Sequence, residues 1–251
     1  MPRVSQAKGW RNKEMFAQID KIITAIDNAV WGLPLICLIM ATGIFLTARL
    51  GLVQIRHLGK AFKFMFKDEE DGSGEVTSFG ALCTALSATI GTGNITGVAT
   101  AIALGGPGAL FWMVIAAFFG MATKYAEGLL AIKYRTIDED GHVLGGPFYY
   151  IEKGMGKNFK WLAKLFCVFG TMVGLFGIGT FTQVNGITSA VNNFFDPSNI
   201  HTISLFGMNY SISVVVAGII VTVCAGLVII GGIKRISKVS EVIVPFMAII
   251  Y

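Results

Sequence analysis

The chain has 251 residues, of which 54% are hydrophobic and only 14% are charged. Soluble domains carry about 25% charged residues, so this composition excludes a soluble globular protein and indicates a membrane protein. The formal net charge of +5 would suggest an anionic partner in a soluble protein, but here its distribution among the loops is more informative, and no nucleic-acid partner is expected.

The first 28 residues are predicted to form an amphipathic helix that lies in the membrane interface. In "KEMFAQIDKIITAIDNAV", residues 13–30, apolar side chains recur at helical spacing and form one stripe, with the charged side chains elsewhere. The segment is not a cleavable signal, because charges interrupt it and no short apolar core ends in a small-residue cleavage site.

Six apolar segments follow and predict membrane spans. They run over about 29–50, 79–104, 107–132, 161–195, 212–233 and 239–251. The complete ones reach the roughly 20 residues that a hydrocarbon core of about 30 Å requires. The fourth is longer, which predicts a tilted helix. The sixth stops within an apolar run, so we expect the chain to be the front part of a longer transporter-sized protein.

Lysine and arginine predict the orientation of these spans. The loops after spans one, three and five are rich in both residues, whereas "GG" and "DPSNIHTISLFGMNY", after spans two and four, contain neither. The positive-inside rule makes the odd loops cytoplasmic and places the N-terminus outside, although the basic N-terminal tail opposes this. We expect a multi-pass protein of the plasma membrane of a bacterium or archaeon.

The second span contains residues typical of a helix interruption. "GTGN", residues 91–94, lies near the middle of "LCTALSATIGTGNITGVATAIALGGPGALFWM". Glycine in a helix interior costs about 1 kcal/mol relative to alanine, and Thr and Asn side chains compete for backbone hydrogen bonds. Small residues also allow close packing of membrane helices, and this alternative stays open.

An unwound backbone at membrane depth is tolerated where it is buried in protein or lines a cavity. Freed carbonyls together with hydroxyl and amide oxygens suit sodium, and the N–H groups that begin the second half-helix suit a carboxylate. Residues 79–104 include no Asp or Glu, which favours a zwitterionic ligand over a monoamine and sodium over a proton.

Several long motifs resemble the alanine or glycine:cation symporter family, also called sodium:alanine symporters. They are "IGTGNITGVATAIALGGPGALFWM", "ATKYAEGLLAIKYR", "GGPFYYIEKGMG" and "SKVSEVIVPFMAIIY". The resemblance implies an all-α polytopic membrane protein, the first half of a five-plus-five inverted-repeat (LeuT-like) transporter fold with one extra N-terminal helix. Residues 29–50 would be that extra helix and residues 79–251 the first five-helix repeat. The missing second repeat would be needed to complete the site.

The interrupted segment also resembles the first broken helix of sodium-coupled neurotransmitter transporters. This resemblance implies that the carbonyls of Ser87 and Ile90 face one sodium ion. The carbonyl of Thr89 and the side chain of Asn94 would face another. The N–H groups of Thr92 and Gly93 would face the carboxylate of the substrate, with Asn94 able to serve ion or substrate.

A second polar cluster, "GTFTQVN", lies in the fourth apolar segment. Gln183 is a candidate substrate ligand, because an amide this deep in an apolar helix is unfavourable unless it is paired. A hydrogen bond between helices, with a net contribution of about 1 kcal/mol, explains it equally well. Phe181 is a candidate for the apolar wall of the pocket, with simple packing as the alternative.

The sequence therefore predicts a secondary active symporter that couples sodium influx, with proton influx as an alternative, to uptake of a small neutral amino acid such as alanine or glycine. Sodium would be the coupling ion, and no catalytic residue is expected. A membrane enzyme would need ionisable groups gathered at one depth, and a channel would need a repeated or symmetric lining. A transport-inactive fragment of such a carrier is a narrower alternative.

Overall fold

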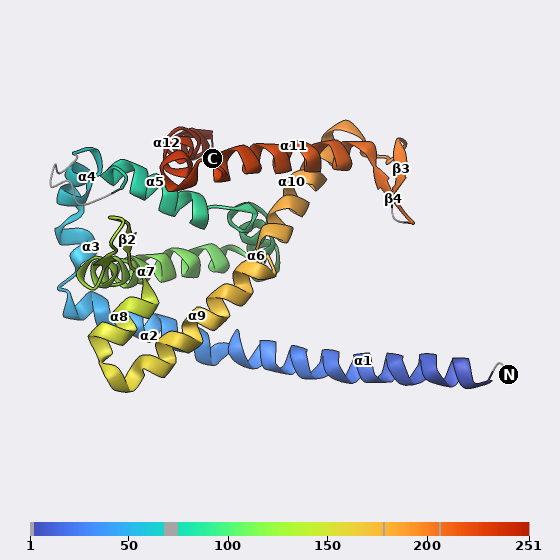
Figure 1. Cartoon of the computed structure of the whole chain (residues 1–251), viewed down its shortest axis with the longest axis horizontal. Helices are drawn as coiled ribbons and strands as arrows, with labels where there is room; N and C mark the ends of the chain where they lie inside the picture. The colour runs from blue at the N-terminus through green and yellow to red at the C-terminus, as the bar shows by residue number, and fades with distance from the viewer. Residues whose placement is uncertain (1–2, 68–74, 178, 206, 251) are drawn as a thin grey trace. The chain divides into compact units, whose positions relative to one another are not determined.

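A computed structural model describes residues 3–67, 75–177, 179–205 and 207–250, and most of them are helical (Figure 1). Four helical segments within these residues are long and apolar enough to cross a membrane: Phe16–Arg49, Pro107–Lys133, Lys157–Phe195 and Ile212–Ile229. The chain divides into two compact units, one made of Met1–Arg56 and Met113–Ala126 and the other of His57–Trp112 and Glu127–Tyr251. Each unit is described by itself below.

The first unit contains three helices and the central part of a fourth. They are α1 (Arg3–Val30), α2 (Leu33–Arg49), α3 (Val53–Arg56) and the middle of α7 (Pro107–Lys133). Pro34 lies in the first turn of α2, where its missing N–H is tolerated. Gly43 of α2 is buried against the backbone of Phe119, and an added Cβ would lie 2.9 Å from the Phe119 Cβ. Small-residue contact therefore holds α2 against α7.

The second unit contains the remaining helices and two short hairpins. Its helices are α4 (Leu58–Phe66), α5 (Ser78–Thr89), the π-helical turn η1 (Gly93–Gly97), α6 (Val98–Gly105), α8 (Pro147–Met155), the 3-10 turn η2 (Lys157–Phe159), α9 (Lys160–Leu175), α10 (Thr180–Phe195), α11 (Ile212–Ile229) and α12 (Gly232–Ile250). Strand β1 (Thr136–Ile137) pairs antiparallel with β2 (Val143–Leu144), and β3 (Thr202–Leu205) with β4 (Met208–Ser211). The sequence did not predict the hairpins or the short helices of the loops.

The fourth apolar segment differs from the single tilted helix that its length predicts. Helix α9 ends at Leu175 and α10 begins at Thr180. Gly177 and Gly179 have φ angles of +60° and +91°, a backbone conformation that glycine adopts without the steric cost of a Cβ. The described residues of this segment therefore form two helices, α9 and α10.

Helix α5 packs along α12. Cys83 of α5 and Val244 of α12 are buried, as are Ser237 and Ser240. Thr77 caps α5 by accepting a hydrogen bond from the Gly80 N–H at 3.0 Å. The same Thr77 hydroxyl donates to Glu241 Oε1 at 3.1 Å, so the cap also joins the start of α5 to α12.

Candidate functional site

Helix α5 ends at the predicted interruption. The N–H of Ile90 donates to the Leu86 carbonyl, and Ile90 itself has an extended backbone with φ −84° and ψ 121°. In a continuous helix the Gly91 N–H would bond to the carbonyl of Ser87, but here it donates to Asn94 Oδ1 at 3.0 Å. The Asn94 N–H in turn donates to the Gly91 carbonyl at 3.0 Å. Asn94 therefore closes the interruption through both its side chain and its backbone.

A single π-helical turn, Gly93–Gly97, follows the interruption before regular helix resumes at Val98. The N–H of Val98 reaches back five residues to the Gly93 carbonyl. Turns of this kind are rare in proteins, but those that occur often lie at functional sites. The predicted interruption at residues 91–94 thus extends in the structure from Ile90 through Gly97.

Helix α10 contacts this interruption directly. The N–H of Thr92 donates to Gln183 Oε1 at 2.7 Å, which joins positions 91 residues apart in sequence. A Cβ added at Gly91 would lie 2.5 Å from Gln183 Nε2. One added at Gly186 would lie 2.7 Å from Thr92 Cγ2. Glycines on both segments therefore permit the close approach that places the Gln183 amide on the Thr92 N–H.

The structure brings together three of the predicted site residues: Thr92, Asn94 and Gln183. The interhelical hydrogen bond considered as an alternative for Gln183 is present, and it occupies a Thr92 N–H that was predicted to face the substrate carboxylate. Phe181 is not part of this group, because its side chain is 74% exposed and its ring lies over Gly177.

The predicted sodium ligands lie on the last turn of α5 and just after it. The Ser87 hydroxyl donates to the Thr84 carbonyl at 2.7 Å, and the Thr89 hydroxyl donates to the Ala85 carbonyl at 2.8 Å. The roles predicted for Ser87, Thr89 and Ile90 rest on their backbone carbonyls, and these two hydroxyls donate within the helix. Ser240 of α12 donates to the Ser87 hydroxyl at 3.3 Å, which brings a third helix next to this turn.

Sequence reasoning missed Gly186 and Ser240. Gly186 lies three residues after Gln183 and so shares its face of α10, a spacing that would have suggested contact with the same partner. Ser240 carries no local signal, because its role depends on α12 packing against α5.

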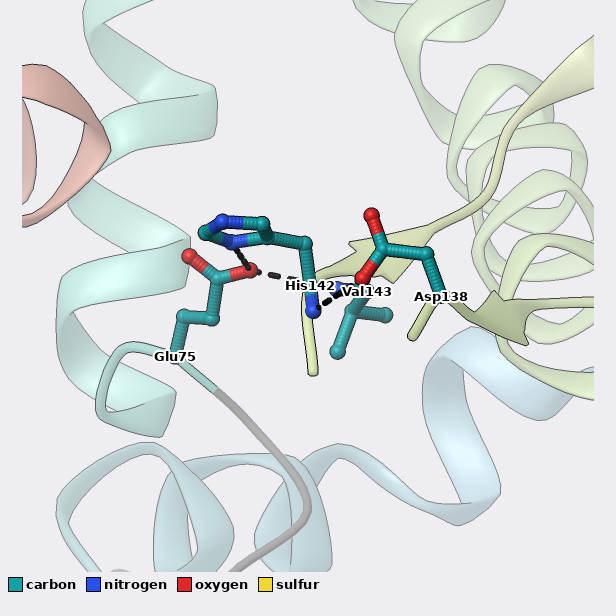
Figure 2. Close-up of polar contacts among 4 residues, drawn as sticks. All are labelled: Glu75, Asp138, His142 and Val143. Carbon is teal, nitrogen blue, oxygen red and sulfur yellow. Dashed lines mark hydrogen bonds and ion pairs between the residues drawn. The ribbon is translucent and has the colours of Figure 1, made fainter. Parts of the chain in front are cut away.

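A separate polar cluster joins the segment before α5 to the β1–β2 hairpin, as Figure 2 shows. Glu75 Oε1 accepts the Val143 N–H at 3.1 Å and lies 3.3 Å from His142 Nδ1. Asp138 accepts the His142 N–H at 2.7 Å within the hairpin turn. The hydrogen bond from Val143, assisted by His142, lowers the pKa of Glu75. This cluster ties two loops together.

The loop between α10 and α11 has a comparable anchor. Asp196 is buried and accepts the N–H groups of Ile200 and His201 at 2.9 and 3.1 Å, together with the Ser211 hydroxyl at 3.0 Å. The Ile200 hydrogen bond is the largest cause of a lowered pKa for Asp196, and burial opposes it. Asp196 therefore fixes the start of the β3–β4 hairpin and the end of α10.

The interruption offers neutral oxygens and backbone N–H groups and no fixed charge, since residues 79–104 contain no Asp or Glu. Among the residues that the structure describes, no group of three or more His, Cys, Asp or Glu side chains could hold a metal ion. Discontinuous helices of transporters offer neutral oxygens and backbone N–H groups of this kind to ions and substrates.

The sequence model of the sodium:alanine symporter family matches residues 16–251. The chain belongs to this family. It is 56% identical over 233 residues to an uncharacterized transporter of Haemophilus influenzae, covering 93% of this chain and 47% of that protein. It is 45% identical over 234 residues to the sodium/alanine symporter AgcS of Methanococcus maripaludis, covering 92% of this chain and 48% of AgcS. The chain thus spans about half the length of these relatives.

Membership places the chain in a family of membrane transporters, in agreement with its apolar helices. The helix interruption, the π-helical turn and the Gln183 contact all lie within the segment that the family model matches.

Proposed function

We propose that the chain forms the first half of a secondary active symporter that couples sodium influx to uptake of a small neutral amino acid such as alanine or glycine. In this proposal residues 79–251 are the first repeat of a five-plus-five inverted-repeat fold, and residues 29–50 are the extra helix. The N-terminus lies outside the cell. A second repeat completes the site.

The interruption between α5 and α6, with Gln183 on the Thr92 N–H, is the observation that carries this proposal. Irregular backbone at this depth requires protein or a cavity beside it, and the second unit supplies α10 on one side. An added Cβ at Gly93 or Gly97 would meet no atom within 4 Å, so the described residues leave space beside the turn that follows the interruption. Transporters of the inverted-repeat class bind their substrates at discontinuous helices of this kind.

Sodium is proposed to bind the carbonyls of Ser87, Thr89 and Ile90 and the amide oxygen of Asn94. These are hard neutral oxygens, and a monovalent cation needs no acidic ligand to offset its charge. The Asn94 amide oxygen accepts the Gly91 N–H at 3.0 Å, which holds this oxygen at the interruption. A relative named as a sodium/alanine symporter supports sodium as the coupling ion.

The substrate carboxylate is proposed to bind the N–H groups of Thr92 and Gly93. The Thr92 N–H is bonded to Gln183 Oε1 at 2.7 Å, so carboxylate binding there requires the Gln183 amide to move or rotate. Its NH₂ group would then become a donor to the same carboxylate. Gln183 would thus hold the site closed without substrate and contribute a hydrogen bond when substrate is present.

Uptake of radiolabelled alanine into proteoliposomes tests this proposal. The carrier that contains this chain as its first half should accumulate alanine when a sodium gradient is imposed and should fail to do so with a proton gradient alone. Uptake that ignores both gradients would overturn coupling, and equilibration without accumulation would favour a channel. The chain alone, reconstituted in parallel, should be inactive, because half of the proposed site lies in the second repeat.

A further inference from the structure

Helices α8 and α9 meet in a V (Figure 1). Side chains of both helices line an open hollow of about 510 Å³. It lies within the second unit, away from the helix interruption. Its walls are lined by Phe148 and Tyr149 of α8 and by Ala163, Lys164, Cys167 and Val168 of α9. Glu152 and Lys160 form a salt bridge of 2.8 Å at its edge.

The polarity of this hollow changes along α9. Lys160 and Lys164 lie in the first turns of the helix, and Cys167 and Val168 follow one turn later on the same face. Ala163, which is only 3% exposed, lines the hollow beside them. With a rise of about 1.5 Å per residue, the charged end and the apolar end are about 6 Å apart along the axis. The hollow therefore matches an amphiphile better than a freely soluble ion.

The charged end carries an excess positive charge. Lys160 is paired with Glu152, whereas Lys164 makes neither a salt bridge nor a side-chain hydrogen bond to any residue in the described part of the chain. Lys153 lies nearby, where it donates to Thr136 Oγ1 at 2.7 Å and places its ammonium 5.5 Å from the centre of the Tyr149 ring. The orientation predicted from the loop charges puts this end at the cytoplasmic surface, where basic pockets beside membrane helices bind acidic headgroups.

We propose that the hollow between α8 and α9 binds an acidic phospholipid, with the phosphate at Lys164 and an acyl chain along Cys167 and Val168. The lipid would hold α8 at the membrane surface. This site is separate from the proposed transport site, and its existence does not depend on transport activity.

Native mass spectrometry of the purified full chain tests the proposal. The chain should retain phosphatidylglycerol in preference to phosphatidylcholine. Lys164→Gln should weaken that retention about fivefold, as expected for one lysine near an acidic lipid surface. Lys157→Gln removes the same charge outside the hollow and serves as the matched control, with little change expected. Equal effects of the two variants, or no preference for phosphatidylglycerol, would overturn the site.

Alkylation of Cys167 locates the lipid. Two single-cysteine variants are compared, one that retains only Cys167 and one that retains only Cys224. Both are reconstituted in phosphatidylcholine vesicles with and without phosphatidylglycerol. Phosphatidylglycerol should slow the reaction of N-ethylmaleimide with Cys167 and leave Cys224 unaffected, and Lys164→Gln should remove this protection. Protection by inorganic phosphate alone would indicate an anion site, and equal protection in both lipids would indicate that protein covers the hollow. Either result would overturn the lipid proposal.

Discussion

Gly91→Ala is the substitution for which the structure makes the sharpest prediction. Gly91 does not adopt a positive φ, so the backbone tolerates alanine at this position. The added Cβ would nevertheless lie 2.5 Å from Gln183 Nε2 and 2.9 Å from both Cδ and Oε1. The Gln183 amide must therefore move, and the 2.7 Å hydrogen bond from the Thr92 N–H is lost or lengthened.

The expected loss follows from that contact. A net hydrogen bond contributes about 1 kcal/mol, with measured values for membrane helices from about 0.6 to 1.7 kcal/mol. Displacing the packed Gln183 side chain costs at most about 1 kcal/mol more, because the clashing amide is at the flexible end of that side chain. Gly91→Ala should therefore lower the free energy of unfolding by roughly 1 to 2 kcal/mol.

The measurement is the free energy of unfolding of the purified chain in lipid–detergent micelles, for wild type and variants. Gly93→Ala is the matched control, because nothing lies within 4 Å of an added Cβ there. It should leave stability unchanged or raise it slightly. In a Gln183→Ala background, Gly91→Ala should cost less than about 0.5 kcal/mol, since the clashing amide is gone. A full cost in that background, or an equal cost for Gly93→Ala, would refute the assigned contact.

Three further outcomes are expected. Gly186→Ala should destabilise the chain by about 1 to 2 kcal/mol, because the added Cβ clashes with the Thr92 methyl group. Thr92→Ser removes that methyl group and should relieve the loss in the unfolding measurement. Gly170→Ala has open space around it and should change stability little. Asn94→Ala in the carrier should abolish alanine uptake and its ion dependence together, whereas Gly170→Ala at equal folded yield should preserve both in the proteoliposome assay. The pKa of Glu75 is lowered from 4.5 in the folded state. The stabilisation by ionised Glu75 is therefore fully present above pH 4.5 and is lost as the pH falls through the lowered pKa. Hydrogen exchange of the β1–β2 hairpin should accordingly speed up in acid for the wild type but not for Glu75→Gln.

The sequence by itself indicated that this protein lies in a membrane and that its second apolar segment is an interrupted helix. Apolar runs of about 20 residues have few stable states outside a bilayer, so composition and length predicted membrane helices directly. The glycines, Thr92 and Asn94 of residues 91–94 act locally, through backbone freedom and short-range hydrogen bonds. That is why the sequence predicts an interruption at residues 91–94, whereas the structure has irregular backbone at Ile90 and a π-helical turn that continues to Gly97.

Only the tertiary structure decided what meets that interruption. The partnership of Gln183 with Thr92, and the glycines at 91 and 186 that permit it, joins segments about 90 residues apart, and no local pattern encodes which faces of two apolar helices will touch. The turn at Gly177 and Gly179 was hidden for a similar reason, because glycine in an apolar run serves helix packing and helix termination equally well. Long-range packing resolves that ambiguity, since it fixes whether each glycine faces a neighbouring helix or a turn of its own chain.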